Sequence, residues 1–440
     1  MILELDFDYF LIVLSNFKFG TKVLMKIAIL STIPMVPPTA GNRSRILAFV
    51  RALRKLGHEA HFVHLPSLLT DSPDDEAHVK EMGSSRYIRL PVQQLNSVVF
   101  RAKRFMHRVR RKIFRSVGSE LAYYHGLDEH YPSNLSDLLR QVHAKHKFDA
   151  VVCEYIFHSA ALDAFPDHVI KILDTHDSFA NRHRSFPEFS DYWFSVTPED
   201  ELRAFRRADV VIAIQELERS TFSARLGDDS PRVALVSHSL ELEKPVTDFS
   251  SPNALFIGSQ NEANTTALEY FIGSVLPLIL KEIPDFTLLV AGSISRKLEK
   301  MPGVEPLGIV ENLRDAFVAA PINVNPMLNG TGINIKLLEA MAAGVPTVST
   351  ETGSRGLGNT FGNGVLTVSD RDPEAFAMAV IHLARSEELR RTKGALAYQD
   401  AVAWNDAQLA SLRELLAQSA EVEVTRSASP GGLRASSCSA

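Results

Sequence analysis

The chain has 440 residues, of which 45% are hydrophobic and 22% are charged, and its formal net charge is −5. This length exceeds what one hydrophobic core supports, so we expect two large folded domains rather than a disordered chain. The acidic charge argues against a nucleic-acid-binding protein, and the two cysteines exclude a disulfide framework and a thiolate zinc site. A cytoplasmic location is therefore expected.

Residues 1–24 are interpreted as an extension that precedes the first domain. They contain an apolar run, but neither the basic leading segment nor the small-residue cleavage site of a signal peptide. Met25 begins the strand-like stretch MKIAILST and is the alternative translation start. The chain contains no run of the roughly 18 to 20 uninterrupted apolar residues that a membrane-spanning helix requires, so we expect it not to cross a bilayer.

From residue 25 to residue 240, short Val, Ile and Leu runs alternate with longer helical stretches. KIAILS, a helix at 42–56 that ends before Gly57, and EAHFVHL form the first unit, and four further runs follow: DAVVCEY, VIKILDTHD, ADVVIAIQ and RVALVSHS. Such alternation is typical of parallel strands joined by crossover helices, and strands apolar on both faces belong inside a covered sheet. The pattern predicts a Rossmann-like first domain.

Residues 241–253, which are polar and contain prolines, are predicted to be a linker. The alternation then restarts in residues 254–400, with the strand-like runs NALFIGS, DFTLLVAGS, VEPLGIV, PINVNPM, VPTVST and GVLTVSD. Residues 373–418 are helical by pattern, and residues 419–440 have the composition of a disordered tail. The predicted fold class is α/β, with two doubly wound domains that face each other across a cleft.

The stretch NGTGINIKLLEAMAAG, residues 329–344, is a glycine-bracketed loop that leads into an apolar helix. It follows the strand-like run PINVNPM, and open parallel sheets bind ligands at the carboxyl ends of their strands. The first free amides of the helix and Lys336 favour an anion, while Glu339 can accept hydrogen bonds from a sugar diol. These features together describe a nucleotide diphosphate. The alternative is a plain surface salt bridge between Lys336 and Glu339, worth about 0.2–0.5 kcal/mol.

The sequence NGTGINIKLLEAMAAGVPTVSTETGSRGL resembles the donor-binding segment of the group-1 family of retaining glycosyltransferases, which have the two-domain GT-B fold. Three further segments resemble a bacterial branch of that family: DTHDSFANRHR, SVTPEDELRAFRRADVVIAIQELE and ALFIGSQNEANTTALEYFIGSVLPLILKEIPDFTLLVAG. The resemblance extends from residue 25 to about residue 418. It implies that residues 401–418, around Trp404, form a helix that returns to the first domain.

The resemblance also implies roles for individual residues. Glu339 matches the glutamate that holds the nucleotide ribose, and His176 matches a histidine that reaches the transferred sugar. We therefore predict His176 and Lys336 as catalytic residues, and we predict a donor-binding set of Gly41, Gly258, Val310, Gly330, Thr331, Gly332, Lys336 and Glu339. From the residues alone, His176 could equally be a buried histidine that is satisfied by Asp174 or Asp177.

Two departures from the family pattern concern the donor site. Thr331 occupies the position of a first glutamate that normally contacts the donor sugar, and the stretch GSQNEANTTAL lacks the usual Arg and Lys pair. Lys336 is a candidate to replace that pair. Arg45, near the start of the first helix, is a weak candidate for the acceptor site because a cation is unfavourable at a helix N-terminus unless it meets an anion.

The expected chemistry is displacement of a nucleoside diphosphate, whose growing charge is stabilised by fixed donors. No metal and no cofactor are predicted, since the two D-x-D pairs, DFD near the N-terminus and DRD at 370–372, are better explained by solvation. The predicted function is transfer of a sugar from a nucleotide-sugar to a carbohydrate or lipid-linked acceptor in envelope polysaccharide or glycan synthesis. The alternatives are a nucleotide-sugar epimerase on the same fold and a non-catalytic nucleotide-sugar-binding protein.

Residues 98–117 carry eight Lys and Arg residues and no carboxylate in a chain that is acidic overall. On a helix, one face is apolar and is formed by Ala102, Phe105, Met106, Val109, Ile113 and Val117. One interpretation is an ordinary helix that is docked on the first domain by this face. The other is a segment attracted to an anionic membrane surface, which predicts a peripheral location on the inner face of the plasma membrane.

Overall fold

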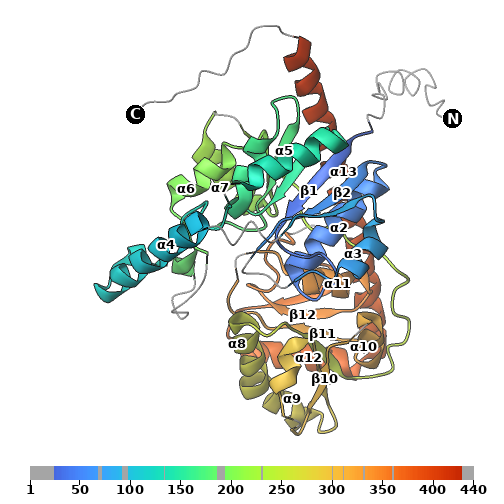
Figure 1. Cartoon of the computed structure of the whole chain (residues 1–440). Coiled ribbons are helices and arrows are strands. Elements are labelled where there is room, and N and C mark those ends of the chain that lie inside the picture. Colours follow the sequence, from blue (N-terminus) through green and yellow to red (C-terminus); the bar gives the residue numbers. More distant parts are fainter. Residues whose placement is uncertain are drawn as a thin grey trace, which may run out of the picture.

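The computed structural model describes residues 24–67, 72–91, 98–132, 134–185, 194–228, 231–299, 301–310, 312–330, 332–358 and 361–428. Within these ranges the chain forms two parallel sheets, each covered by helices (Figure 1). The two doubly wound sheets predicted from the sequence are therefore confirmed. The proposed extension, residues 1–24, lies outside the described residues except for Leu24.

The first sheet has seven parallel strands in the order β3-β2-β1-β4-β5-β6-β7. Its strands are β1 Lys26–Ser31, β2 Glu59–His64, β3 Tyr87–Arg89, β4 Ala150–Glu154, β5 Ile170–Asp174, β6 Val210–Ala213 and β7 Arg232–Leu235. The connecting α-helices are α2 Gly41–Lys55, α3 Asp75–Met82, α4 Val98–Ser116, α5 Leu135–His146, α6 Pro198–Phe205 and α7 Glu216–Leu226. The strand order reverses between β1 and β4, at the centre of the sheet.

Alternate residues of β1 enter two separate cores, one on each face of the first sheet. Ala28 and Leu30 belong to the core that is covered by α5, α6 and α7. Ile27 and Ile29 belong to the opposite core, which contains apolar residues of α2. A strand that is buried on both faces reads as a continuous apolar run, which explains why the sequence pattern located this sheet.

The second sheet has six parallel strands in the order β10-β9-β8-β11-β12-β13. Its strands are β8 Ala254–Ile257, β9 Leu288–Ala291, β10 Val304–Gly308, β11 Asn323–Asn325, β12 Thr347–Thr350 and β13 Val365–Val368. Its α-helices are α8 Glu262–Tyr270, α9 Leu276–Glu282, α10 Leu313–Ala319, α11 Ile335–Ala342 and α12 Pro373–Arg385. The order reverses between β8 and β11, so the crevice that binds ligands in such sheets opens there.

The carboxyl ends of the two sheets face each other. A Cβ atom on Gly41, just after β1, would lie 3.4 Å from Ile335 at the start of α11, and one on Gly332 would lie 3.5 Å from Ile214 at the end of β6. Loops that follow strands of one sheet therefore contact loops that follow strands of the other. This arrangement places the cleft between the two crevices.

Helix α13, Glu387–Ala428, runs from the second domain back to the first. Its residues Ala397, Ala401 and Trp404 pack against α11, and four leucines further along join the α2 side of the first sheet: Leu409, Leu412, Leu415 and Leu416. The expectation of a disordered tail from residue 419 is wrong for its first part, because the helix continues to Ala428. Helix propagation costs little once a helix is formed, so packing upstream extends it. Residues 429–440 lie outside the described residues.

The segment 237–249 runs antiparallel along α13 and is held to it by hydrogen bonds. Trp404 Nε1 donates to the carbonyl of His238 over 2.8 Å, and the side chain of Asn405 accepts from the amide of Leu240 over 2.8 Å. Further along, the buried guanidinium of Arg390 donates to the carbonyl of Phe249 over 2.6 and 2.9 Å. The linker predicted from its prolines therefore lies packed against the returning helix.

One helical stretch in the described residues, Glu262–Glu282, is long and apolar enough to cross a membrane by length and composition alone. It consists of α8, the π-helical turn Phe271–Val275 and α9. Its apolar residues Ala267, Phe271, Val275 and Ile279 lie in the core beneath the second sheet. This packing is that of a core helix of the second domain.

The packing of α13 on the first sheet predicts the effect of truncating one of its leucines. Leu412 is fully buried, so Leu412→Ala should lower the free energy of unfolding by about 2–5 kcal/mol through lost burial and the resulting cavity. Denaturant unfolding measures this difference. Leu217→Ala on the exposed surface of α7 is the control, and equal effects of the two substitutions would contradict the packing.

Candidate functional site

Glycine-containing loops follow β8, β9 and β11 at the carboxyl ends of the strands of the second sheet. The loop after β8 contains Gly258, and the loop after β11 contains Gly330 and Gly332. A Cβ atom on Gly292, whose φ is +97°, would lie 2.2 Å from the carbonyl oxygen of Gly258, so the loops after β8 and β9 pack backbone to backbone. Glycine allows this approach because it has no side chain.

Lys336, in the first turn of α11, reaches across to the loop that follows β8. Its Nζ donates to Oδ1 of Asn264 over 2.7 Å, and Nδ2 of Asn264 donates to the carbonyl of Ser259 over 2.8 Å. Asn264 is buried at the start of α8. The lysine ammonium is thus fixed between two glycine loops and beside the N-termini of α8 and α11, where backbone amides favour an anion.

A network of amide side chains fixes the start of α11. Asn334 caps this helix, and its Nδ2 donates to Oδ1 of Asn325 in β11 over 2.7 Å. Asn325 in turn donates to Ser349 and to the carbonyl of Gly353, both over 3.0 Å. Arg355 donates to the carbonyl of Gly330. These contacts hold the loop in one position before any ligand arrives, which lowers the entropic cost of binding.

Glu339 lies one turn beyond Lys336 and faces a cavity between the two domains. The cavity has a volume of about 250 Å³ and is lined by residues of α2, the 238–243 segment, the start of α10 and α11. Among the described residues, no side chain donates a hydrogen bond to the carboxylate of Glu339, and its α11 neighbour Lys336 donates to Asn264 instead. The surface salt bridge considered for this pair is therefore not formed.

Burial shifts both charges toward their neutral forms. It lowers the pKa of Lys336 to about 8, although the nearby Glu339 opposes this shift. It raises the pKa of Glu339 to about 7, with Lys336 as the opposing charge. Each group carries a desolvation cost that an external partner of opposite polarity can offset, as expected at a ligand site.

The predicted residue His176 lies beneath the first domain's side of the cleft. It is buried, its Nε2 is hydrogen-bonded to Glu154, and its ring stacks on Tyr155 with 4.0 Å between ring centroids. Tyr155 and His176 both have positive φ, of 67° and 59°, which is strained for residues with a side chain. Such strain persists where the surroundings impose it, often at functional sites. Glu154 thus makes the hydrogen bond to Nε2 of His176, and Oδ2 of Asp174 lies 4.0 Å from the same nitrogen.

Arg45 is not at an acceptor site. Its guanidinium is buried and donates to both carboxylate oxygens of Asp174, over 2.8 and 3.0 Å, and to the carbonyl of Val236 over 3.0 Å. Residue 45 faces the sheet from α2, where Asp174 ends β5. The cation near the helix N-terminus is thus explained by an internal ion pair, which corrects the acceptor-site prediction.

The remaining predicted residues fall in three places. Gly41 lies at the start of α2, opposite Ile335 across the cleft. Val310 is half-buried in the apolar cluster beneath α10 and is not among the residues that line the cavity. Thr331 lies outside the described residues. The structure thus places Gly330, Gly332, Lys336 and Glu339 on α11 and the loop before it, sets Gly41 opposite, and leaves Gly258 in the loop after β8.

The acidic pairs considered for metal binding also have defined positions. In the DRD sequence, Asp370 accepts from Thr352 and Asp372 caps α12, while DFD lies outside the described residues. Glu154, Asp174 and His176 lie close enough in the described structure to hold a cation, but the carboxylate of Asp174 is bound by Arg45. These carboxylates are better explained by structural contacts.

Comparison with known proteins identifies the class to which this site belongs. Residues 251–386 match the family model for group 1 glycosyl transferases, and this range contains the whole second sheet. The second domain is a group 1 glycosyltransferase domain, and the chain is a glycosyltransferase with the GT-B fold. A curated relative from Klebsiella pneumoniae, described as an uncharacterized 44.6 kDa protein in the cps region, is 24% identical over 82% of this chain and 92% of its own length.

Solved structures share the fold at low sequence identity. Staphylococcus aureus TarM, in a structure with UDP and alpha-GlcNAc-glycerol, matches with a TM-score of 0.63 at 11% identity over 89% of this chain and 99% of its own. Sucrose-phosphate synthase of Thermosynechococcus elongatus matches with a TM-score of 0.61 at 18% identity over 92% and 100%. The pneumococcal O-GlcNAc transferase GtfA, solved with UDP and GlcNAc, has a TM-score of 0.61 at 11% identity over 90% and 99%.

The pKa values of Lys336 and Glu339 predict how the affinity for a nucleoside diphosphate depends on pH. Below about pH 7 Glu339 gains a proton and loses its capacity to accept from two hydroxyls, and above about pH 8 Lys336 loses the charge that attracts phosphate. The affinity for a nucleoside diphosphate, measured by calorimetry, should therefore be highest between these values.

Two substitutions test the acidic and the alkaline limb of this plot of affinity against pH separately. Glu339→Gln should flatten the acidic limb down to the pH at which the diphosphate itself takes up a proton, and Lys336→Met should flatten the alkaline limb. A profile that is unchanged by both substitutions would show that neither group meets the ligand.

Proposed function

We propose that the chain transfers a sugar, of hexose type, from a nucleotide-sugar to a carbohydrate or lipid-linked acceptor, with retention of configuration. The observation that carries this proposal is the position of Lys336, fixed by Asn264 where two glycine loops and two helix N-termini converge. The cps-region relative supports a role in cell-envelope polysaccharide synthesis, and the UDP-bound structures with the same fold support a nucleotide-sugar donor.

The proposed chemistry uses fixed positive charge at the leaving group. As the bond from the sugar to the diphosphate breaks, negative charge grows on the phosphate oxygens, and Lys336 with the amides of α8 and α11 stabilises it without a metal. Glu339 holds the nucleotide through ribose hydroxyls, so it acts equally on the ground and transition states. Retention requires the acceptor to approach from the face that the diphosphate leaves, which places it on the first-domain side, near Gly41.

The two α11 charges should differ in their kinetic effects. Lys336→Ala should lower kcat by roughly 10²- to 10³-fold, because its charge matters most as the diphosphate leaves. Glu339→Ala should mainly weaken nucleotide binding, by about 1.5–3 kcal/mol for a charged hydrogen-bond partner. Lys281→Ala on the exposed side of α9 is the matched control.

The assay for these variants uses a panel of nucleotide-sugars and also separates the competing functions. Release of nucleoside diphosphate together with a glycosylated acceptor supports transfer. A changed sugar on an intact nucleotide would indicate an epimerase, and binding without any turnover would indicate a non-catalytic protein. Wild-type kinetics in both α11 variants would refute the assignment of this donor site.

His176 and Glu154 give a second test on the first domain. If His176 donates to the transferred sugar, His176→Ala should lower kcat by about 10²-fold with little change in the KM of the donor. Glu154→Gln should lower kcat less, since an amide can still hold the ring. The exposed His382→Ala is the control, melting temperatures check folding, and full activity of His176→Ala would make the pair purely structural.

A further inference from the structure

Helix α4 projects from the first domain and contacts it along one side only (Figure 1). On that side Phe100 is buried, Nη1 of Arg111 donates to Glu129 over 2.6 Å, and Nζ of Lys103 donates to the carbonyl of Asp128 over 2.7 Å. His107 packs over Gly126, where a Cβ atom would lie 2.9 Å from its ring. Polar groups of α4, together with Phe100, therefore hold it to the domain.

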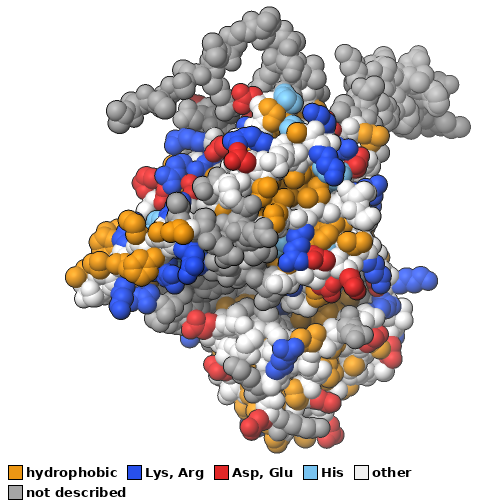
Figure 2. All heavy atoms as spheres, viewed as in Figure 1, with side chains coloured by type: hydrophobic (Ala, Val, Ile, Leu, Met, Phe, Trp, Pro, Cys, Tyr) orange, Lys and Arg blue, Asp and Glu red, His pale blue; other side chains and the backbone are white. Residues whose placement is uncertain are grey.

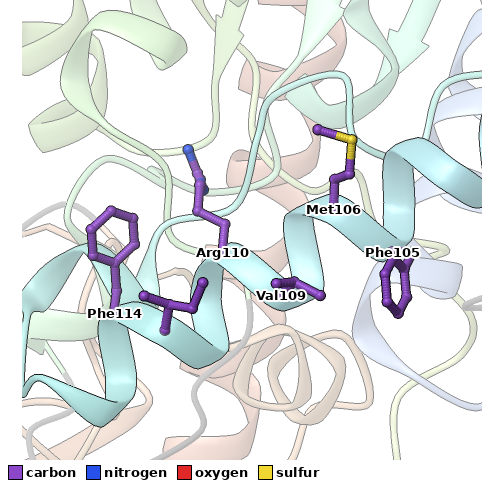
Figure 3. Close-up of a pocket in the computed structure, with 6 residues that line it drawn as sticks. Phe105, Met106, Val109, Arg110 and Phe114 are labelled. Atoms are coloured by element: carbon purple, nitrogen blue, oxygen red, sulfur yellow. The ribbon is translucent and has the colours of Figure 1, made fainter.

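The opposite side of α4 is apolar and exposed to solvent. Large fractions of its side chains are accessible: Val98 82%, Phe105 61%, Met106 69%, Val109 39%, Ile113 57% and, just beyond the helix, Val117 70%. A groove of about 340 Å³ on this side is lined by residues of α4 alone, among them Phe105, Met106 and Val109 (Figure 3). The interpretation of a helix that is docked by its apolar face is therefore wrong.

Cations border this apolar face along both edges. At 100° per residue, Arg101, Arg108 and Lys112 fall on one edge. Lys103 and Arg110 fall on the other edge, and both also donate to backbone carbonyls of the domain. All five are exposed, and the helix contains no carboxylate. Figure 2 shows the apolar side chains of the projecting helix with Lys and Arg side chains beside them. Large exposed apolar faces in folded proteins usually mark interaction sites.

We propose that α4 docks on an anionic lipid bilayer, with its apolar face among the acyl chains and its flanking cations at the headgroups. This chemistry matches both halves of the surface, because a bilayer offers an apolar interior next to a layer of negative charge. A second copy of the chain would cover the apolar face but would bring two rows of cations together. A nucleic acid would neutralise the cations but leave the apolar side chains in water.

The proposal concerns a surface that is separate from the donor site. Binding to vesicles can therefore be measured without any nucleotide, and its outcome does not depend on the proposed glycosyl transfer. Where it is combined with that function, docking holds the chain at the surface that carries a lipid-linked acceptor.

The test is cosedimentation of the whole chain with vesicles of phosphatidylcholine alone or with phosphatidylglycerol added, at low and high salt. Binding should require the anionic lipid and should weaken as salt shortens the Debye length. Each headgroup contact is worth about fivefold in affinity, so Arg101→Gln, Arg108→Gln and Lys112→Gln combined should weaken binding by roughly 100-fold. Phe105→Ser combined with Met106→Ser should also weaken it, by at least tenfold, through lost apolar burial.

The matched control is Leu217→Ser combined with Met378→Ser, which removes equally exposed apolar side chains elsewhere and should leave vesicle binding unchanged. Circular dichroism confirms that each variant is folded. Equal binding to neutral vesicles, or no binding to anionic vesicles at low salt, would overturn the proposal. So would sedimentation showing that the wild-type chain self-associates and that the Phe105 and Met106 variant is monomeric, because the occupant would then be a second copy.

Discussion

The desolvated charges of Lys336 and Glu339 are the constraint around which the cleft is organised. Both groups lie on one face of α11 with their pKa values shifted toward neutrality, and neither is neutralised by the other. The rest of the structure compensates for the desolvation of these two side chains, because α11 is held by its asparagine cap, by the core beneath it and by α13 behind it. A ligand with a phosphate group and hydroxyls would offset the desolvation of both side chains.

The first domain presents a different kind of chemistry to the same cleft. Its charges are paired with one another, with Arg45 bound by Asp174 and His176 bound by Glu154 at the carboxyl ends of adjacent strands. Glu154 is buried, and burial raises the pKa of its carboxyl, while His176 and Arg45 act in the opposite direction. The first domain thus presents internally paired charges to the cleft, whereas Lys336 and Glu339 of the second domain do not pair with each other. This asymmetry is consistent with donor binding on the second domain.

Sequence patterns were sufficient for the fold because both sheets are buried on two faces and their strands read as apolar runs. The glycine loop and the spacing of Lys336 and Glu339 are local features, so the sequence also placed both charges on one helix after a glycine loop, where the structure has them. Contacts between residues that are far apart in the sequence could not be predicted from it. Asn264 contacts Lys336, 72 residues further along the chain, and Glu154 contacts His176, 22 residues further along. A polar Asn264 on the otherwise apolar inner face of α8 was the available signal. For α4, the same apolar periodicity is expected whether the apolar face packs on the domain or is exposed, so only the structure could distinguish these two arrangements.

The pairing of α13 with the segment 237–249 has a mechanical consequence. The chain crosses between the domains twice, and the two crossings lie side by side, joined by Trp404, Asn405 and Arg390. Two adjacent crossings that are hydrogen-bonded to each other restrain the relative motion of the domains more than a single linker would. A donor that contacts both domains across the cleft would restrain their relative motion further.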